Sequence, residues 1–290
     1  MSVKVYLKAG LGNQLFMIFA GFSYALKHNK EFKIISYFNS AMCGKNYTYW
    51  NNILKYFENS LVDNPQSTIE ESNKYNEPHF AYCPIPDELS NKEDTVLFGF
   101  FQSEKYFKEY YNIIAEKMQL SKQLLDIKTE NINLFRKKTI AIHFRIGDYI
   151  HLQGNHPIKK PEYFIYALKS LDTELKTRGE NIEDYDILYF SQKQDFQTVE
   201  EFIRIFKYIF NEKLNFVKVS DNIPDWKQLL LMANCNHFII ANSTFSWFAA
   251  YFCENMNKIV YYPKIWFGKN LQQTHDTKDL FPSGWKEINA

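Results

Sequence analysis

Residues 139–148 read TIAIHFRIGD, a strand pattern that is followed at once by an arginine and a Gly-Asp turn. Its first half has the apolar, β-branched character of a buried strand. Arg145 follows that strand, so its guanidinium lies at a carboxyl end, where open α/β sheets bind ligands. The planar fork of N–H donors matches phosphate oxygens and stays charged at any working pH. We interpret Arg145 as a pyrophosphate clamp, with a local ion pair to Asp148 as the alternative.

Strand and helix patterns alternate on both sides of this stretch, which is typical of parallel sheets. An apolar helix separates strands at 3–7 and 32–36, and residues 63–94 have the composition of a long binding or lid loop. We expect further strands at 95–101, 139–144, 186–190, 215–219, 237–241 and 258–261, and helices at 104–120, 161–176, 195–206, 224–233 and 244–253.

Length and pattern together predict an α/β protein of two facing, doubly wound Rossmann-like domains. The chain has 290 residues and is 46% hydrophobic, enough for two cores. The expected domains are 1–136 and 137–290, joined by a basic linker near residues 136–138. Facing domains of this kind hold a ligand in the cleft between them.

Charge and cysteine content exclude several classes of function. The 34 Lys and Arg residues nearly cancel the 33 Asp and Glu residues, so no broad basic field exists for nucleic acid or an anionic membrane. The four cysteines are widely separated, which argues against a zinc knuckle and a disulfide scaffold. We expect no nucleic-acid partner and a reducing, cytoplasmic location.

The apolar run at residues 15–26 has the length of a signal-peptide core. A strand pattern and a polar, Gly-rich turn precede it, however, and no small-residue cleavage site follows before the Lys-rich residues 27–30. The run is also shorter than the roughly 20 residues that a membrane-spanning helix needs. We therefore expect a soluble protein with no integral membrane segment.

A second candidate site is the turn GLGNQ at residues 10–14. It begins like a dinucleotide-binding fingerprint, but Leu15 stands at the third glycine position, and no acidic residue follows the second strand. The amides of Asn13 and Gln14 are candidates for holding a sugar or a phosphate oxygen. Capping of the following helix is the alternative.

The third candidate site is the segment NSTFSW at residues 242–247, which starts a helix after a strand. Its hydroxyls and amide exceed what one helix cap requires, so we infer a second anion-binding edge opposite Arg145 on one nucleotide diphosphate. Ser243 as a hydrolytic nucleophile is disfavoured because no G-x-S-x-G elbow is present. For His143, a general base, a nucleobase contact and a backbone-bonded strand-end histidine all remain open.

These segments resemble glycosyltransferase family 11, the α-1,2-fucosyltransferases of the bacterial type. The resemblance covers residues 10–26, the block LFGFFQ at 97–102 with the following Tyr106-Phe107, the signature HFRIGDY at 143–149, and residues 226–266. The blocks occur in the family's order along nearly the whole chain. The segment IANSTFSW at 240–247 lies in the closest match.

The resemblance implies a GT-B fold, GDP-fucose as donor, inversion at the anomeric carbon, and no metal or other cofactor. The first domain would take the acceptor, a galactose-terminated oligosaccharide, and the second would take GDP-fucose. The implied catalytic residues are Arg145 at the β-phosphate, Asn13 near the reacting centre, and Asp148 as a candidate base. The implied donor-binding residues are Gly12, Gln14, His143, Asn242, Ser243, Thr244 and Ser246.

Two positions depart from the family pattern. Ile146 stands where many relatives have a second arginine, and Gln228 where others have an aspartate, with Asp225 three positions earlier. Asp148 equally fits the role of orienting Arg145. The expected activity is transfer of fucose to the 2-hydroxyl of a terminal galactoside. The alternatives are a related GDP-fucose transferase with another hydroxyl or a peptide acceptor, and a non-catalytic nucleotide-sugar or glycan-binding protein.

Overall fold

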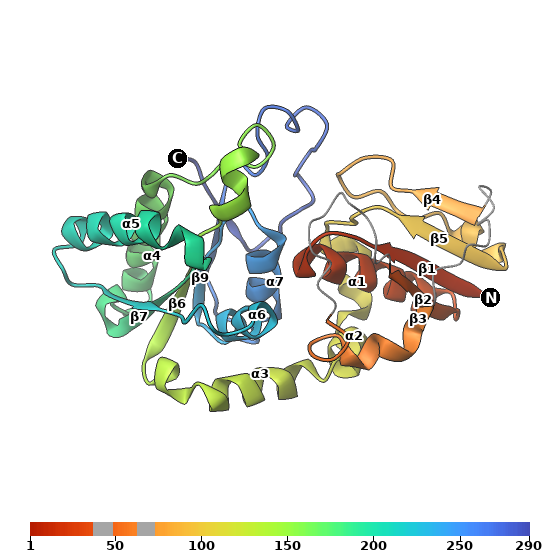
Figure 1. The fold of residues 1–290 in the computed structure, drawn as a ribbon, viewed down its shortest axis with the longest axis horizontal. Helices are drawn as coiled ribbons and strands as arrows, with labels where there is room; N and C mark the ends of the chain where they lie inside the picture. Colours follow the sequence, from red (N-terminus) through yellow and green to blue (C-terminus); the bar gives the residue numbers. More distant parts are fainter. Residues whose placement is uncertain (37–48, 63–72) are drawn as a thin grey trace. The chain divides into compact units, whose positions relative to one another are not determined.

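The computed structural model describes residues 1–36, 49–62 and 73–290, and it divides the chain into two compact units, each with one parallel sheet (Figure 1). Unit 1 comprises Met1–Ser121 and Thr274–Pro282, and unit 2 comprises Lys122–Gln273 and Ser283–Ala290. Two Rossmann-like units on one chain are the components of the GT-B type. The predicted α/β fold class is thereby confirmed.

The sheet of unit 1 has the strand order β3-β2-β1-β5-β4, and all its pairings are parallel. The first strand is therefore flanked by β2 and β5, so the carboxyl ends of β1 and β5 lie side by side. The strands are β1 (Ser2–Leu7), β2 (Glu31–Ser36), β3 (Leu61–Val62), β4 (Lys74–Asn76) and β5 (Asp94–Phe98), and the helices include α1 (Leu11–Lys27) and α2 (Tyr111–Lys117).

Helix α1 is the apolar run that resembled a signal-peptide core. Its residues are buried on nearly every side, as expected for a helix that is hydrophobic all round. Gly21 allows the helix to approach the sheet closely, because a Cβ atom there would lie 2.2 Å from Val5 Cγ1 and 2.9 Å from the Phe32 ring. No helix in the described part of the chain is long and apolar enough to cross a membrane.

Unit 2 has a six-stranded parallel sheet of order β11-β10-β9-β6-β7-β8. Numbered within the unit, this is the order 3-2-1-4-5-6 of a dinucleotide-binding Rossmann sheet, with its switch point between β6 and β9. The strands are β6 (Lys138–His143), β7 (Tyr185–Phe190), β8 (Asn215–Lys218), β9 (His237–Ile239), β10 (Val260–Pro263) and β11 (Lys286–Ile288). The helices are α3 (Leu120–Glu130), α4 (Pro161–Thr177), α5 (Phe196–Ile209), α6 (Asp225–Ala233) and α7 (Thr244–Phe252).

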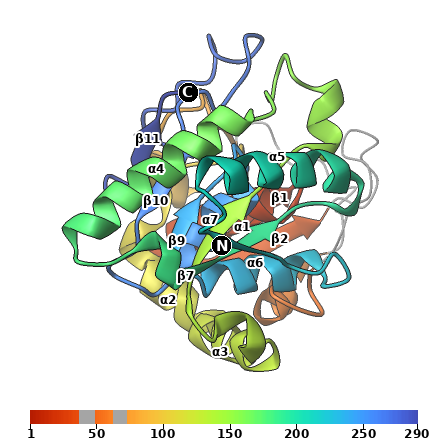
Figure 2. The same ribbon diagram turned by 90° about the vertical axis from the view of Figure 1, so that its left-hand side faces the viewer.

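Alternation along β6 sorts its side chains between the two faces of the sheet. Ile140, Ile142 and Phe144 pack into the core cluster formed with α4 and α5. His143 lies on the other side, with its ring 5.5 Å from that of Phe245 at the start of α7. Figure 2 shows α4 and α5 together across one face and α6 beyond the other. Unit 2 is therefore doubly wound, as predicted.

The predicted division near residue 136 is corrected to Ser121, and a later segment returns to unit 1. Helix α3 belongs to unit 2 because the Asn234 side chain donates to the Leu124 carbonyl (3.0 Å) and Lys227 pairs with Glu130 (2.6 Å). The returning segment Thr274–Pro282 is held by Asp279, whose carboxylate accepts from the Tyr82 amide at 3.2 Å and pairs with Lys105 at 2.5 Å. Neither the contacts of α3 nor those of Asp279 can be predicted from local sequence periodicity.

Most predicted elements are confirmed, with ends that differ by a few residues. The predicted helix at 104–120 is wrong in detail: it consists of two short 3-10 turns, Glu104–Tyr106 and Lys108–Tyr110, followed by α2. The predicted loop at 63–94 includes β4, while its first part, 63–72, lies outside the described residues. Strands β3, β4 and β11 are too short to show a periodic pattern.

The close approach at Gly21 gives a stability prediction. Gly21→Ala should lower the free energy of unfolding by about 1–3 kcal/mol through overpacking, despite the better helix propensity of alanine. Urea unfolding measures this, with Gly284→Ala as the control because no described atom lies within 4 Å of a Cβ there. Equal stability of Gly21→Ala and wild type would contradict this packing.

Candidate active site

The switch point of unit 2 places three strand ends side by side. Strand β6 pairs in parallel with β7 on one side and with β9 on the other, so the residues after each strand share one edge of the sheet. Arg145 follows β6, Ser191 and Asp195 follow β7, and Asn242 follows β9. Ligands of open α/β sheets bind at this edge.

Asp148 holds the Arg145 guanidinium in place, but it pairs with only one of the three guanidinium nitrogens. Both carboxylate oxygens of Asp148 contact Nη2, Oδ1 at 2.8 Å and Oδ2 at 2.9 Å. The buried Nε finds no hydrogen-bond partner among the described residues. A pair this exposed contributes only about 0–1 kcal/mol to stability, so its main effect is to orient the guanidinium. The geometry therefore favours orientation of Arg145 over proton abstraction as the role of Asp148.

Tyr149 links the Arg145 turn to the end of β9. The Arg145 guanidinium lies 5.2 Å from the centre of the Tyr149 ring, and His156 stacks on that ring at 4.9 Å. Burial raises the pKa of Tyr149 to about 12, so its hydroxyl keeps its proton. The hydroxyl donates to the carbonyl of Asn242 at 3.0 Å. Arg145 and Asn242 are thus tied together through one aromatic side chain.

Asp195 supports the Arg145 turn from β7. It stands at the N-cap of α5, yet it makes no side-chain cap hydrogen bond. Its Oδ1 accepts instead from the Gly147 amide at 2.9 Å, and it is only 3% exposed. A Cβ atom on Gly147 would lie 2.0 Å from Gln192 Oε1, so a larger residue there would displace the end of the Gln192 side chain. Burial raises the pKa of Asp195, while the Gly147 amide and Arg145 act in the opposite direction.

His143 is a buried, neutral imidazole. Burial, and secondly the charge of Arg145, lower its pKa to about 3. A group with this pKa is a poor proton acceptor near pH 7, which disfavours the general-base interpretation. Its Nδ1 is buried without a partner in the described part of the chain, so the structure gives no support to the backbone-bonded alternative through that nitrogen. A contact with the nucleotide stays a prediction.

Several polar groups in the segment after β9 form hydrogen bonds that hold the local structure. The Asn242 amide donates to the carbonyls of Pro157 (3.1 Å) and Trp266 (3.0 Å), which fixes two neighbouring loops. Ser243 caps α7 by accepting from the Phe245 amide at 3.4 Å. Ser246 is fully buried and donates to the Ser243 carbonyl, which assigns it to the cap. Thr244 is half-buried in the first turn of α7.

Unpaired polar atoms gather along this edge of unit 2. Buried polar atoms normally have partners, and a buried one without any costs about 1–3 kcal/mol. Such a cluster therefore indicates a ligand that completes the hydrogen bonds. Without a partner among the described residues are His143 Nδ1, Arg145 Nε, Ser191 Oγ, Asp195 Oδ2 and Asn242 Oδ1.

Unit 1 has a second polar site at the adjoining carboxyl ends of β1 and β5. Asn13 lies in the first turn of α1, and its Oδ1 accepts from Gln102 Nε2 at 2.8 Å. Gln102 is 7% exposed, and its Oε1 is buried with no partner in the described residues. Backbone turns with positive φ precede both, at Ala9 (φ 65) and Phe101 (φ 50). Non-glycine residues in this region are uncommon, and such conformations cluster at functional sites.

The remaining predicted residues of unit 1 shape this turn. Gln14 is 7% exposed, and its side-chain amide donates to the Ala9 carbonyl at 2.9 Å, which holds the β1–α1 turn. Gly12 is buried at the start of α1. The predicted site residues therefore form two groups, one in each unit. Donor contacts by Gly12 and Gln14 stay predictions.

Gln228, which stands where other family members have an aspartate, has a structural role of its own. Its side-chain amide donates to the Ile223 carbonyl at 2.8 Å, which closes the loop before α6. An aspartate could not make this bond, because a carboxylate only accepts. Asp225 contacts the Trp226 amide at 2.7 Å at the start of the same helix.

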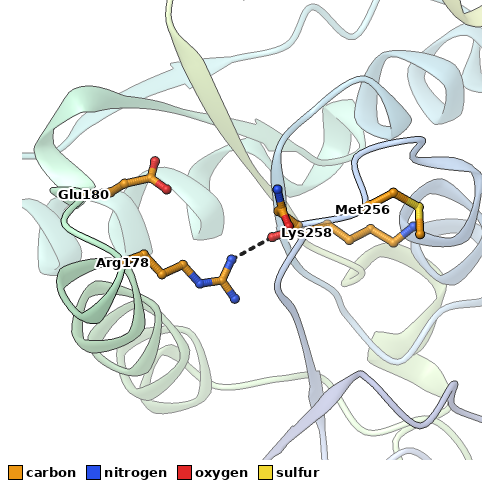
Figure 3. Close-up of a pocket in the computed structure, with 5 residues that line it drawn as sticks. Arg178, Glu180, Met256 and Lys258 are labelled. Atoms are coloured by element: carbon orange, nitrogen blue, oxygen red, sulfur yellow. Dashed lines mark hydrogen bonds between the residues drawn. The ribbon is translucent and has the colours of Figure 1, made fainter.

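A surface pocket of about 310 Å³ lies in another part of unit 2 and is lined by Arg178, Glu180, Met256, Asn257 and Lys258 (Figure 3). Its residues precede β7 and β10, so it lies at the amino edge of the sheet. Its charged groups already have partners: Arg178 contacts Glu174 (2.7 Å) and the Asn257 carbonyl (2.8 Å), and Glu180 pairs with Lys138 (2.5 Å). We do not assign the active site to it.

Comparison with known proteins identifies the family. The model of glycosyl transferase family 11 matches residues 81–289, which is most of the chain. The chain belongs to glycosyl transferase family 11. It is a glycosyltransferase, and the resemblance seen in its motifs is confirmed at this level.

Relatives within this family are distant in sequence. The alpha-1,2-colitosyltransferase of Escherichia coli is 25% identical over 311 aligned positions, which cover 99% of each chain. The O-antigen biosynthesis glycosyltransferase WbnK of Escherichia coli is 26% identical over 193 residues, 63% of this chain and only 58% of WbnK. Among solved structures, Escherichia coli ADP-heptose heptosyltransferase II is 10% identical with a TM-score of 0.49, over 99% of this chain and 90% of that one.

Sequence reasoning missed several residues of these two sites. Gln102 lies at the end of the block LFGFFQ but was not predicted to be a site residue. Asp195 has the appearance of an ordinary helix cap, which hides its contact with Gly147. A polar residue directly after each of the predicted strands, 95–101 and 186–190, is the signal that points to Gln102 and Ser191.

The neutral state of His143 predicts a pH-dependent stability. The unfolded histidine binds a proton below its ordinary pKa of 6.5, whereas folded His143 does so only near 3. Folded-state stability should therefore fall as pH drops from about 6.5 toward 3, by about 1.4 kcal/mol per pH unit. His143→Gln should remove the contribution of His143 to this slope, as measured by urea unfolding at pH 7.5 and pH 5.

His237 is the matched control for that measurement. It is buried in the same unit, at the amino end of β9, and its pKa is lowered to about 4 by burial and by Arg178. His237→Gln should change the pH slope similarly and leave nucleotide binding unaltered, whereas His143→Gln should weaken GDP binding. A wild-type slope in His143→Gln would contradict the neutral, buried state of His143.

Proposed function

We propose that the protein transfers fucose from GDP-fucose to the 2-hydroxyl of a terminal galactoside, with inversion and without a bound metal. The observation that carries the donor assignment is Arg145 at the switch-point edge of unit 2, with its buried Nε unpaired. A diphosphate is the part of a nucleotide sugar that matches this fork of donors. Membership of family 11 supports glycosyl transfer as the reaction.

Unit 2 is proposed to bind the donor. Arg145 meets the β-phosphate, and the first turn of α7, with Ser243 and Thr244, supplies backbone and hydroxyl donors to the same diphosphate. The helix dipole adds partial positive charge there. His143, which stays neutral, donates or accepts a hydrogen bond on the nucleoside. Asp148 and Asp195 hold the Arg145 turn through the contacts described above.

Unit 1 is proposed to bind the acceptor. The Asn13–Gln102 pair leaves the Asn13 amide N–H groups and the Gln102 carbonyl oxygen for a ligand. Such mixed donors and acceptors match sugar hydroxyls. Asn13 would then orient the attacking hydroxyl.

The chemistry requires charge stabilisation on the departing group. The acceptor oxygen forms a bond to the anomeric carbon while the bond from that carbon to the phosphate oxygen breaks, and the hydroxyl proton leaves to a base or to water. Positive charge develops on the sugar and negative charge on GDP. Fixed donors at the phosphate act where this charge appears, which is the most effective form of electrostatic catalysis. We assign that role to Arg145 and the α7 N-terminus.

Colitosyl transfer is a second candidate. The relative aligned over 99% of both chains is an alpha-1,2-colitosyltransferase. Colitose is fucose without its 3-hydroxyl, so the two donors differ by one hydrogen-bonding group. A site that bonds this hydroxyl rejects the deoxy sugar by about four orders of magnitude, whereas a site that ignores it accepts both.

The first experiment measures GDP release in EDTA. Purified protein is incubated with GDP-fucose, GDP-colitose, GDP-mannose or UDP-galactose, each with and without lactose. Lactose-dependent GDP release from GDP-fucose supports the proposal, and linkage analysis of the product tests the 2-hydroxyl. Preference for GDP-colitose selects the second candidate, and activity only with added divalent metal contradicts metal independence.

The alternatives give different results in the same assay. A product linked through another hydroxyl, or turnover only with a peptide acceptor, indicates a related transferase. Tight GDP binding without turnover on any acceptor indicates a nucleotide-sugar or glycan-binding protein. Failure to bind GDP at all would refute the donor assignment.

Substitution of Arg145 tests the role of its charge. Arg145→Ala should lower kcat by about a hundredfold or more, as loss of an oxyanion donor does. Arg145→Lys should recover only part of this, because an ammonium keeps the charge but not the fork. Arg178→Ala is the control: it removes an arginine of the same unit from the amino-edge pocket. Normal kcat in Arg145→Ala would eliminate the proposed role.

A further inference from the structure

A carboxylate from the neighbouring strand supports the Asn13–Gln102 pair. Glu77 directly follows β4, and its backbone amide donates to the Phe98 carbonyl at 2.7 Å, which extends the β4–β5 pairing to the last residue of β5. The Glu77 side chain therefore lies beside the segment that leads from β5 to Gln102. Family assignment and motif analysis gave this residue no role.

One oxygen of Glu77 organises two successive backbone amides. Oε2 accepts from the Phe100 amide at 2.7 Å and from the Phe101 amide at 3.0 Å. Successive N–H groups that converge on one anion form a rigid backbone concavity. Burial raises the pKa of Glu77, and these two hydrogen bonds, with the nearby Lys8, act in the opposite direction. The carboxylate thus serves as an internal ligand for the backbone.

The shape of the segment depends on this carboxylate. Gly99 is required, because a Cβ atom there would lie 2.5 Å from both Cβ and Oε2 of Glu77. Phe101 is fully buried and has a φ of 50°, a conformation that a bulky residue adopts only when its surroundings enforce it. The two amide bonds to Glu77 supply part of that enforcement. Gln102 is the next residue.

The segment is also fixed beyond Gln102. The Ser103 hydroxyl donates to the Asp279 carbonyl at 2.6 Å, and the Tyr106 ring packs edge-on against Phe101 at 5.2 Å. The backbone on both sides of Gln102 is therefore held by groups outside the site. Gln102 is left to present its side chain to Asn13.

We propose that Glu77 is a positioning residue for the acceptor site of unit 1, acting through the Phe100 and Phe101 amides on Gln102 and so on Asn13. This inference rests on the proposed function, since it assigns the Asn13–Gln102 pair to the acceptor. It adds a residue whose side chain need not touch substrate. Misplacement of a positioned group by 1 Å can cost about a hundredfold in rate.

The test compares Glu77→Ala and Glu77→Gln in the GDP-release assay. Glu77→Ala should lower kcat/KM for the acceptor by about 10- to 100-fold. Glu77→Gln keeps an oxygen that accepts from both amides, so it should stay within about threefold of wild type. The Kd for GDP should change by about twofold or less in both, because unit 2 is proposed to bind GDP. A loss in Glu77→Gln equal to that in Glu77→Ala would overturn positioning through the amides.

A double-mutant cycle tests whether Glu77 acts through Gln102. Once Gln102→Ala has removed the positioned group, adding Glu77→Ala should cost little more, so the two losses should not add. Additive losses would overturn the inference. Where Glu77→Ala does not fold, Glu77→Asp takes its place: it keeps the charge but withdraws the carboxylate by one methylene, and full activity in it would also overturn the inference.

Asp94→Ala is the matched control for stability. Asp94 also lies in unit 1 and accepts hydrogen bonds from the Ser2 amide (3.0 Å) and hydroxyl (2.8 Å), but at the amino end of β5. Asp94→Ala should lower the melting temperature and leave kcat/KM for the acceptor unchanged. An inactive wild type would refute the proposed function itself, whereas an active wild type with an equally active, folded Glu77→Ala would refute only the role of Glu77.

Discussion

The parallel pairing of β6 with β7 on one side and β9 on the other is the constraint on which the site of unit 2 depends. It brings three strand ends to one edge, although their residues are separated by about 50 positions in sequence. Each end then contributes one function: Arg145 from β6, Asp195 from β7 and Asn242 from β9. Tyr149 and Gly147 join these ends by hydrogen bonds, so a shift of one strand would disturb all three.

The sites are built from groups that are expensive to bury. Arg145 Nε, His143 Nδ1 and Asp195 Oδ2 are buried without partners among the described residues, and each such atom costs free energy in the unliganded protein. The large cores, such as the cluster beneath α4 and α5, offset that cost. Unit 1 has two similarly unfavourable features, the positive φ of Phe101 and the buried Gln102 Oε1 with no partner among the described residues. Both candidate sites thus contain buried polar atoms without partners among the described residues.

The sequence predicted the class of fold, and it pointed to some of the residues that the structure places at the two candidate sites. Alternating periodicities identified the strands and helices of unit 2, and the strand-to-turn junctions identified Arg145, Asn13 and Asn242. Contacts distant in sequence stayed invisible, such as Glu77 with the Phe100 amide or Asp195 with Gly147. The unit boundary was missed for the same reason, because α3 and Asp279 are placed by long-range bonds. Local sequence patterns predict which residues are buried and where turns occur. They do not predict which polar groups, distant in sequence, form hydrogen bonds with one another.

The isoleucine after Arg145 follows from the same geometry. Ile146 is 5% exposed and packs in the core cluster with Phe144 and Phe164, on the face covered by α4 and α5. An arginine with this backbone would place its charge in an apolar core, at a cost of several kcal/mol. Ile146 is therefore a core residue in this chain rather than a vacant phosphate contact. In the proposed donor site the positive charge then comes from Arg145 and the α7 N-terminus, while Asp148 pairs with Arg145 and Asp195 holds the turn at Gly147.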